Sequence, residues 1–254
     1  MENLTQKAVE KKRINVSIMI PVFFVSTLWL IYFAEYATGI DFSWLGILPR
    51  TLSGLSGILF TPFLHGSLGH LLSNSIPLLV LGGGLIYFYR SIAYKVLLWI
   101  WFIDGLGVWL LGRDAYHIGA SGLVYGIAAF LIFSGLLRRN RNLLALSLAV
   151  VFVYGSLIWG MFPYIPDISW EAHLFGFLAG IYFSVHFLGD GPSNDYVPEW
   201  MYENEEDETV PQKLSQENDI SEETKEQEGS NTSDQQISIR YSYKQKELDK
   251  EEGD

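Results

Sequence analysis

A few polar side chains in this sequence could do chemistry within otherwise apolar surroundings. Ser121 is followed by Tyr125, His173 lies near the end of the apolar region, and His70 is followed by Asn74. A serine hydroxyl becomes a nucleophile when a base such as histidine takes its proton. Amide and imidazole N–H groups can stabilise the oxyanion that such an attack creates. If the fold brings these residues together, they supply the parts for acyl transfer.

Each segment also has a purely structural explanation when it is taken alone. His70 and Asn74 are four residues apart and share one helix face, as polar residues do at an interfacial helix start. The Gly119-Ala-Ser121-Gly segment also fits a small-residue packing motif between membrane helices. His173, with small residues three and seven positions later, would serve equally well as a structural hydrogen bond between helices.

The elements that must position these residues are membrane-spanning helices. Long runs without charge recur along the chain, and about 20 apolar residues suffice to cross the hydrocarbon core. Residues 51–68 are broken by glycine, proline and serine, and we expect an irregular or short-helical loop there. We predict an all-α bundle of six crossings, at residues 14–34, about 68–89, 96–112, 115–137, 142–166 and 172–189.

Composition divides the chain into a membrane body and an acidic tail. Residues 1–190 hold 11 Lys and Arg against 9 Asp and Glu, whereas residues 191–254 hold 6 against 19. This distribution excludes a plain soluble enzyme and a basic nucleic-acid binder. We expect a short cytoplasmic segment at 1–13, a membrane domain at 14–190 and a disordered cytoplasmic tail at 191–254.

The basic residues predict the orientation. With six crossings, nine Lys and Arg residues fall on the side of both termini and two fall on the other side. The positive-inside rule then places both termini in the cytoplasm, and we expect a multi-pass protein of the cell membrane. The second, fourth and sixth crossings run inward. They carry Asn74, Ser121 and His173 in their first turns, at a similar depth near the outer surface; Ser121 would lie roughly 10 Å below it.

The three segments together resemble the rhomboid family of intramembrane serine proteases. The resemblance covers about residues 14–190 and rests on three motifs: His65-xxxx-His70-xxx-Asn74, His117-Ile-Gly-Ala-Ser121-Gly with Tyr125, and Ala172-His173-xx-Gly176-xxx-Gly180. It implies a six-helix rhomboid bundle that hydrolyses peptide bonds in or near transmembrane segments of other membrane proteins, close to the extracytoplasmic face.

The resemblance also assigns roles to residues. Ser121 would be the nucleophile and His173 the general base, while His70 and Asn74 would form the oxyanion hole with the Ser121 N–H. Tyr125 would stack on His173. Gly119 would line the polar cavity, and His65 would have a supporting role. No cofactor and no metal are expected, and the partners are membrane protein substrates and the lipid bilayer, not nucleic acid. The sequence leaves the oligomeric state and the natural substrate open.

Some features depart from this pattern. The first outer loop has Pro49-Arg50 where many family members carry a Trp-Arg pair, and Asp104 is an unusual charge within a crossing. We expect Asp104 to lie too deep to orient His173 and to form a hydrogen bond with a neighbouring helix. Glu171 and Asp167 are also poorly placed for orienting it, so a dyad is predicted.

Two other functions remain open. A catalytically inactive rhomboid-like binding factor would share the fold, but such proteins usually lack the serine or the histidine. A transporter or proton relay would explain the scattered histidines, but it predicts internal repeats that this sequence lacks.

Overall fold

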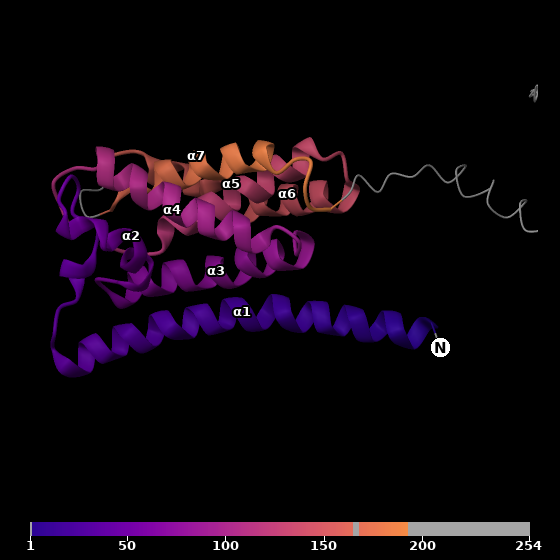
Figure 1. Cartoon of the computed structure of the whole chain (residues 1–254), viewed down its shortest axis with the longest axis horizontal. Coiled ribbons are helices and arrows are strands. Elements are labelled where there is room, and N and C mark those ends of the chain that lie inside the picture. Colours follow the sequence, from indigo (N-terminus) through magenta and orange to yellow (C-terminus); the bar gives the residue numbers. More distant parts are fainter. Residues whose placement is uncertain (1, 165–167, 193–254) are drawn as a thin grey trace, which may run out of the picture. The chain divides into compact units, whose positions relative to one another are not determined.

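The computed structural model describes residues 2–164 and 168–192, and for residues 2–6 the backbone alone. The prediction of an all-α membrane protein is confirmed, since this part of the chain holds helices and no strand (Figure 1). The α-helices are α1 (Glu2–Thr38), α2 (Gly57–Phe60), α3 (Leu68–Phe88), α4 (Ala93–Leu111), α5 (Ser121–Leu137), α6 (Arg141–Tyr154) and α7 (Trp170–His186). Short 3-10 helices are η1 (Ser43–Leu45), η2 (Ser53–Leu55), η3 (Thr61–Phe63) and η4 (Gly155–Met161).

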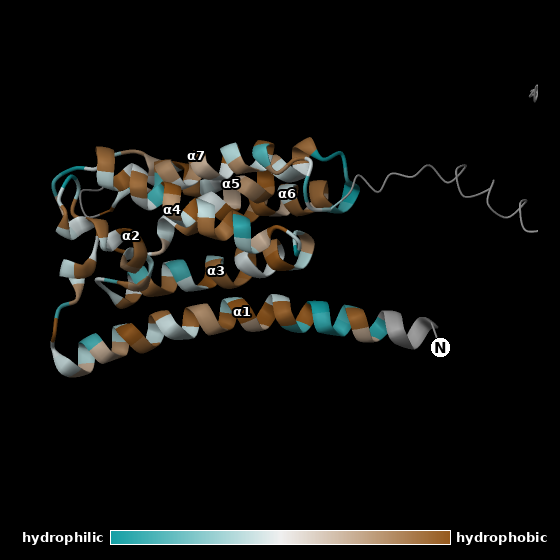
Figure 2. Cartoon of the chain, in the orientation of Figure 1, coloured by the Kyte–Doolittle hydropathy of each residue, from teal (hydrophilic) through white to brown (hydrophobic). Residues whose placement is uncertain are grey.

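Within the described residues, four helical stretches are long and apolar enough to cross a membrane. They are Lys7–Thr38 in α1, α3, α4, and Arg141–Met161, which α6 and η4 form together. Figure 2 shows the hydrophobic residues that cover much of these helices. Helices α5 and α7 have 17 residues each, which gives each a length of about 26 Å. That is short of a full hydrocarbon core, so a crossing by α5 and by α7 stays a prediction.

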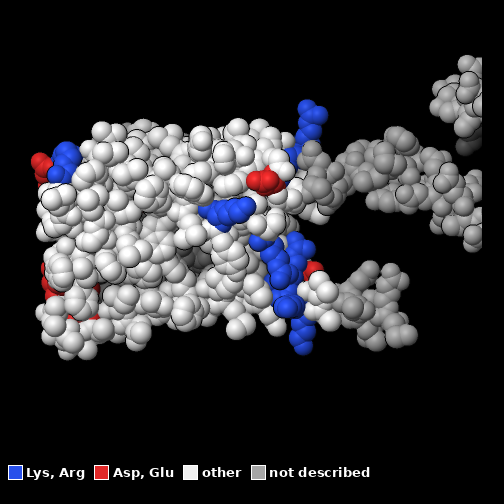
Figure 3. Space-filling view, viewed as in Figure 1, with Lys and Arg blue, Asp and Glu red and all other residues white. Residues whose placement is uncertain are grey.

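The first helix is longer than the predicted crossing. It begins at Glu2 and ends at Thr38, so it continues through residues 2–13 and beyond residue 34. The predicted acidic tail lies outside the described residues except for Gly191 and Pro192. Figure 3 shows most of the visible Lys and Arg side chains near the end where α1 begins. This agrees with the predicted charge bias, while the orientation in the membrane stays a prediction.

Helix α5 is the most enclosed element and packs directly on α7. Most of its residues are buried, among them Gly122 and Gly126. A Cβ atom added at Gly176 of α7 would lie 2.1 Å from the Gly122 carbonyl oxygen, and one at Gly180 would lie 2.2 Å from that of Gly126. Only glycine allows the two backbones to approach this closely. The contact brings the start of α5 beside the start of α7.

The segment between α1 and α3 is an irregular run of short helices, as predicted for residues 51–68. It is fixed to the segment before α5 by an antiparallel bridge between Ile47 and His117. The hydroxyl of Thr61 donates to the His117 carbonyl at 3.0 Å, and the Thr61 carbonyl accepts from the Gly119 N–H at 2.9 Å. These bonds determine the path by which the chain enters α5.

Candidate active site

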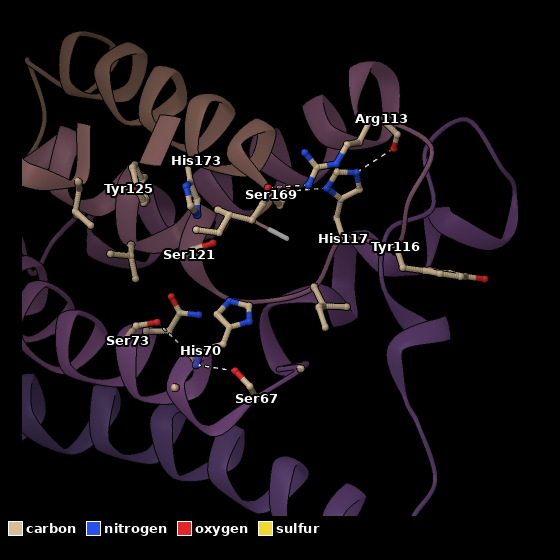
Figure 4. A pocket seen from close by; sticks show the side chains of 17 residues that line it. Ser67, His70, Ser73, Arg113, Tyr116, His117, Ser121, Tyr125, Ser169 and His173 are labelled. Atoms are coloured by element: carbon tan, nitrogen blue, oxygen red, sulfur yellow. Dashed lines mark hydrogen bonds between the residues drawn. The ribbon is translucent and has the colours of Figure 1, made fainter. Parts of the chain in front are cut away.

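A pocket of about 560 Å³ opens where α3, α5 and α7 begin. The predicted residues His70, Asn74, Ser121, Tyr125 and His173 all line it. Figure 4 labels four of them, His70, Ser121, Tyr125 and His173. Its other lining residues are Gly66, Ser67, Gly69, Ser73, Arg113, Tyr116, His117, Ile118, Val124, Leu157, Ile168 and Ser169. The fold therefore gathers into one cavity polar groups that lie up to about a hundred residues apart in the sequence.

Ser121 is the first residue of α5, and its hydroxyl has no hydrogen-bond partner within the described part of the chain. In Figure 4 its side chain is drawn between those of His173 and His70. The N-cap residue Ala120 offers no side-chain acceptor to the first N–H groups of the helix. Those N–H groups carry partial positive charge and suit an anion that forms beside Ser121. Because catalytic hydrogen bonds often tighten only when substrate binds, a nucleophilic serine does not need a hydrogen bond to its base before then.

His173 is held in a defined orientation by two other elements. Its Nδ1 lies 2.7 Å from the carbonyl oxygen of Gly160 in η4. A carbonyl only accepts, so Nδ1 carries the hydrogen and Nε2 keeps a free lone pair. The Tyr125 ring stacks on the imidazole, with 4.1 Å between the ring centroids and 6° between the planes. In this tautomer Nε2 can accept a proton.

The predicted oxyanion residues lie against Gly119, which was expected to line the cavity but is not among the residues that line it. Gly119 has φ of +112°, which side chains rarely adopt. A Cβ atom there would lie 2.5 Å from Nε2 of His70 and 3.6 Å from Nδ2 of Asn74. The glycine thus lets the backbone before Ser121 pass close to both donors. This proximity is what an oxyanion site next to Ser121 requires.

His65 lies behind Asn74, outside the pocket lining. The Asn74 amide nitrogen is 3.1 Å from His65 Nε2, and because an amide nitrogen only donates, Nε2 accepts. This leaves the second N–H of Asn74 available to the pocket. Burial lowers the pKa of His65 to about 4, so the imidazole is neutral near pH 7.

We expect His65 to make the protein less stable in acid. Its pKa is about 4 in the folded protein against 6.5 for the unperturbed group. Below pH 6.5 the unfolded chain therefore binds a proton that the folded one excludes. The contribution of neutral His65 to the free energy of unfolding is therefore complete above the pKa of the unfolded chain. It falls by roughly 3 kcal/mol in all as the pH falls towards 4. Unfolding in mixed micelles, at about pH 7 and about pH 4, measures this loss.

His65→Gln is the control, because glutamine keeps an acceptor for Asn74 but does not titrate. The variant is expected to show a weaker pH dependence of its unfolding free energy. Equal pH dependence of the unfolding free energy in the two proteins would show that His65 does not cause the loss of stability in acid.

The acidic residues near the pocket correct two expectations. Asp104 is not too deep, because its carboxyl group lies against Gly122, where an added Cβ would be 1.9 Å from Oδ2. The expected interhelical hydrogen bond is not formed by Asp104 Oδ1, which is buried and has no hydrogen-bond partner among the residues that the structure describes. Glu171 is buried and pairs with Arg113 at 3.7 Å, and Asp167 lies outside the described residues. Within those residues the Nδ1 partner of His173 is a backbone carbonyl, not a carboxylate.

A second serine–histidine pair lines the same pocket, and the sequence did not reveal it. His117 Nδ1 lies 2.6 Å from the Ser169 hydroxyl, and its Nε2 lies 3.1 Å from the Arg113 carbonyl oxygen. Nε2 therefore donates, and Nδ1 accepts from the serine. Burial lowers the pKa of His117. Because these residues lie in separate loops, no periodicity in the sequence places them together.

Comparison with known proteins shows the family of the chain. Residues 52–189 match the Rhomboid domain. The chain is 38% identical over 172 residues to uncharacterized proteins of Mycobacterium tuberculosis and Mycobacterium bovis, covering 62% of this chain and 70% of theirs. It is 34% identical over 168 residues to an uncharacterized protein of Mycobacterium leprae, covering 62% of this chain and 66% of that one. The chain is an integral membrane protein that belongs to the rhomboid family.

Proposed function

We propose that this protein is an intramembrane serine endopeptidase with Ser121 as nucleophile and His173 as general base. The observation that carries the proposal is the fixed tautomer of His173. Its Nδ1 donates to the Gly160 carbonyl, so Nε2 keeps its lone pair, and the same pocket contains the Ser121 hydroxyl, which has no hydrogen-bond partner among the described residues.

The reaction would proceed by acyl transfer. Ser121 Oγ attacks the scissile carbonyl carbon while its proton moves to His173 Nε2. His70, the free N–H of Asn74 and the Ser121 N–H stabilise the oxyanion. His173 then donates the proton to the leaving amine, and the acyl-enzyme remains on Ser121. A water molecule, deprotonated by His173, hydrolyses this ester and restores the serine.

The substrates would be transmembrane segments of other membrane proteins. Ser121 lies at the start of α5, which the predicted orientation places near the extracytoplasmic face, with both termini cytoplasmic. A peptide bond within a helix is protected by the helix hydrogen bonds, so cleavage requires local unwinding. We therefore expect preferred cleavage at small residues with glycine or proline nearby, since both weaken a helix.

Labelling with a fluorophosphonate tests the nucleophile. The reagent is expected to label the purified wild-type protein and to leave Ser121→Ala unlabelled, because only an activated serine attacks phosphorus rapidly. Ser169→Ala is the matched control, since Ser169 lines the same pocket and bonds to a histidine. This variant should label like wild type.

Three other outcomes would contradict the proposal. Labelling that is lost in Ser169→Ala but kept in Ser121→Ala would place the nucleophile at Ser169. Labelling that persists in both variants would place it at another residue. A wild-type protein that neither labels nor cleaves membrane substrates would favour the inactive binding factor.

A further inference from the structure

Gly160 lies where η4 contacts both the proposed general base, His173, and the Tyr125 ring that stacks on it. Its carbonyl oxygen accepts from His173 Nδ1 at 2.7 Å. A Cβ atom added at Gly160 would lie 2.0 Å from the Tyr125 hydroxyl oxygen, 3.2 Å from its Cζ and 3.1 Å from His173 Nδ1. The glycine therefore touches the stacked Tyr125–His173 pair at one edge, and no larger residue fits without displacing one of the rings.

A histidine base needs a group that accepts a hydrogen bond from its Nδ1, and the Gly160 carbonyl can be that group. In serine hydrolases with three catalytic residues, a carboxylate accepts from Nδ1, fixes the tautomer and stabilises the imidazolium. Among the described residues, Glu171 pairs with Arg113 and the Asp104 carboxyl group lies against Gly122, and the atom found next to His173 Nδ1 is the Gly160 carbonyl oxygen. A carbonyl oxygen also carries partial negative charge and only accepts, so it can fix the same tautomer.

We propose that Gly160 is a positioning residue for the general base, with its backbone carbonyl in the place that a carboxylate takes in a three-residue system. The proposal rests on the proposed proteolytic function. It assigns the last turn of η4 to the catalytic apparatus, because the absence of a side chain at residue 160 lets the carbonyl reach Nδ1. The Tyr125 ring and the carbonyl then restrain the imidazole from two directions.

A double-mutant comparison tests this role. Gly160→Ala is expected to lower kcat on a membrane-protein substrate by about 100-fold, because displacing a catalytic group by about 1 Å has an effect of this size. KM should stay near its wild-type value, since the carbonyl does not contact substrate. The rate of labelling by a fluorophosphonate should fall in parallel.

The Tyr125 hydroxyl gives the test its specificity. The shortest contact of the new methyl group at residue 160 is with the Tyr125 hydroxyl oxygen, at 2.0 Å, and a Tyr125→Phe background removes that oxygen. Gly160→Ala should therefore cost less than about tenfold there, against about 100-fold in the presence of Tyr125. Gly155→Ala is the control on the same 3-10 helix, because its Cβ would meet only Val151 Cγ1 at 3.9 Å. It should behave as wild type.

The result that would overturn the proposal is a Gly160→Ala variant with wild-type kcat, or a loss of the same size in both Tyr125 backgrounds. An equal loss in Gly155→Ala would also overturn it, because the effect would then belong to the helix as a whole.

A measurement on the unmodified protein separates this inference from the proposed function. The 15N chemical shifts of histidine rings distinguish protonated from unprotonated nitrogens, and comparison with His173→Gln identifies the His173 signals. We expect a protonated Nδ1 and an unprotonated Nε2 at neutral pH. The opposite tautomer would exclude the Gly160 hydrogen bond whether or not the protein is a protease. An absence of cleavage and labelling with the expected tautomer would instead count against the proposed function alone.

Discussion

Replacing His173 by glutamine is expected to lower kcat by about 10⁴-fold or more, with the fold retained. Glutamine is of similar size and can still donate to the Gly160 carbonyl, but it cannot take a proton from Ser121. The loss should affect kcat and fluorophosphonate labelling together, because both reactions use the same nucleophile. A cleavage assay in detergent micelles or proteoliposomes measures the first, and the rate of labelling measures the second.

The matched control for this variant is His117→Gln. His117 is also buried, lines the same pocket and bonds to a serine. The proposed mechanism gives it no role in proton transfer, so this variant should keep most of the wild-type kcat. If His117→Gln lost as much activity as His173→Gln, or if His173→Gln remained active, the assigned base would be wrong.

Gly176→Ala is expected to damage both stability and activity. Its new methyl carbon would lie 2.1 Å from the carbonyl oxygen and 2.8 Å from the carbonyl carbon of Gly122, and these backbone atoms cannot move aside cheaply. The helices α5 and α7 must then separate, which should lower the free energy of unfolding by roughly 3 kcal/mol. Because Ser121 and His173 lie on these two helices, kcat should fall by about 100-fold.

Unfolding in mixed micelles and a cleavage assay on the same preparation measure the two effects. Gly84→Ala is the control within a membrane helix, since its added Cβ would meet only Leu146 and Leu131 side-chain atoms at 3.8 and 3.9 Å. This variant should match wild type. A Gly176→Ala protein as stable and active as Gly84→Ala would show that the close approach of α5 and α7 does not hold the site together.

The sequence predicted the grouping of the site residues because apolar helices of known direction leave few possible arrangements. His70, Ser121 and His173 lie in the first turn of three helices that are expected to run inward, so a shared depth follows from counting residues. The stacking of Tyr125 on His173 came from the family resemblance, and the geometry matches it. The long packed helices are therefore the part of the fold that the sequence predicts best.

The features that escaped prediction lie in short helices and loops. Gly160 belongs to a 3-10 helix whose path no periodicity fixes, and a glycine near the end of an apolar run was the only signal. The bond between His117 and Ser169 joins two loops. The contact of the Asp104 carboxyl group with Gly122 joins α4 to α5. Such contacts depend on tertiary packing, which local sequence does not encode.

The most direct test of the account is cleavage of a transmembrane substrate by the purified protein reconstituted in proteoliposomes, with Ser121→Ala prepared in parallel. The wild-type protein is expected to release defined fragments, cut near the outer end of the substrate helix, and Ser121→Ala is expected to release none. Equal cleavage by both proteins, or no cleavage of any tested membrane segment by the folded wild-type protein, would contradict it.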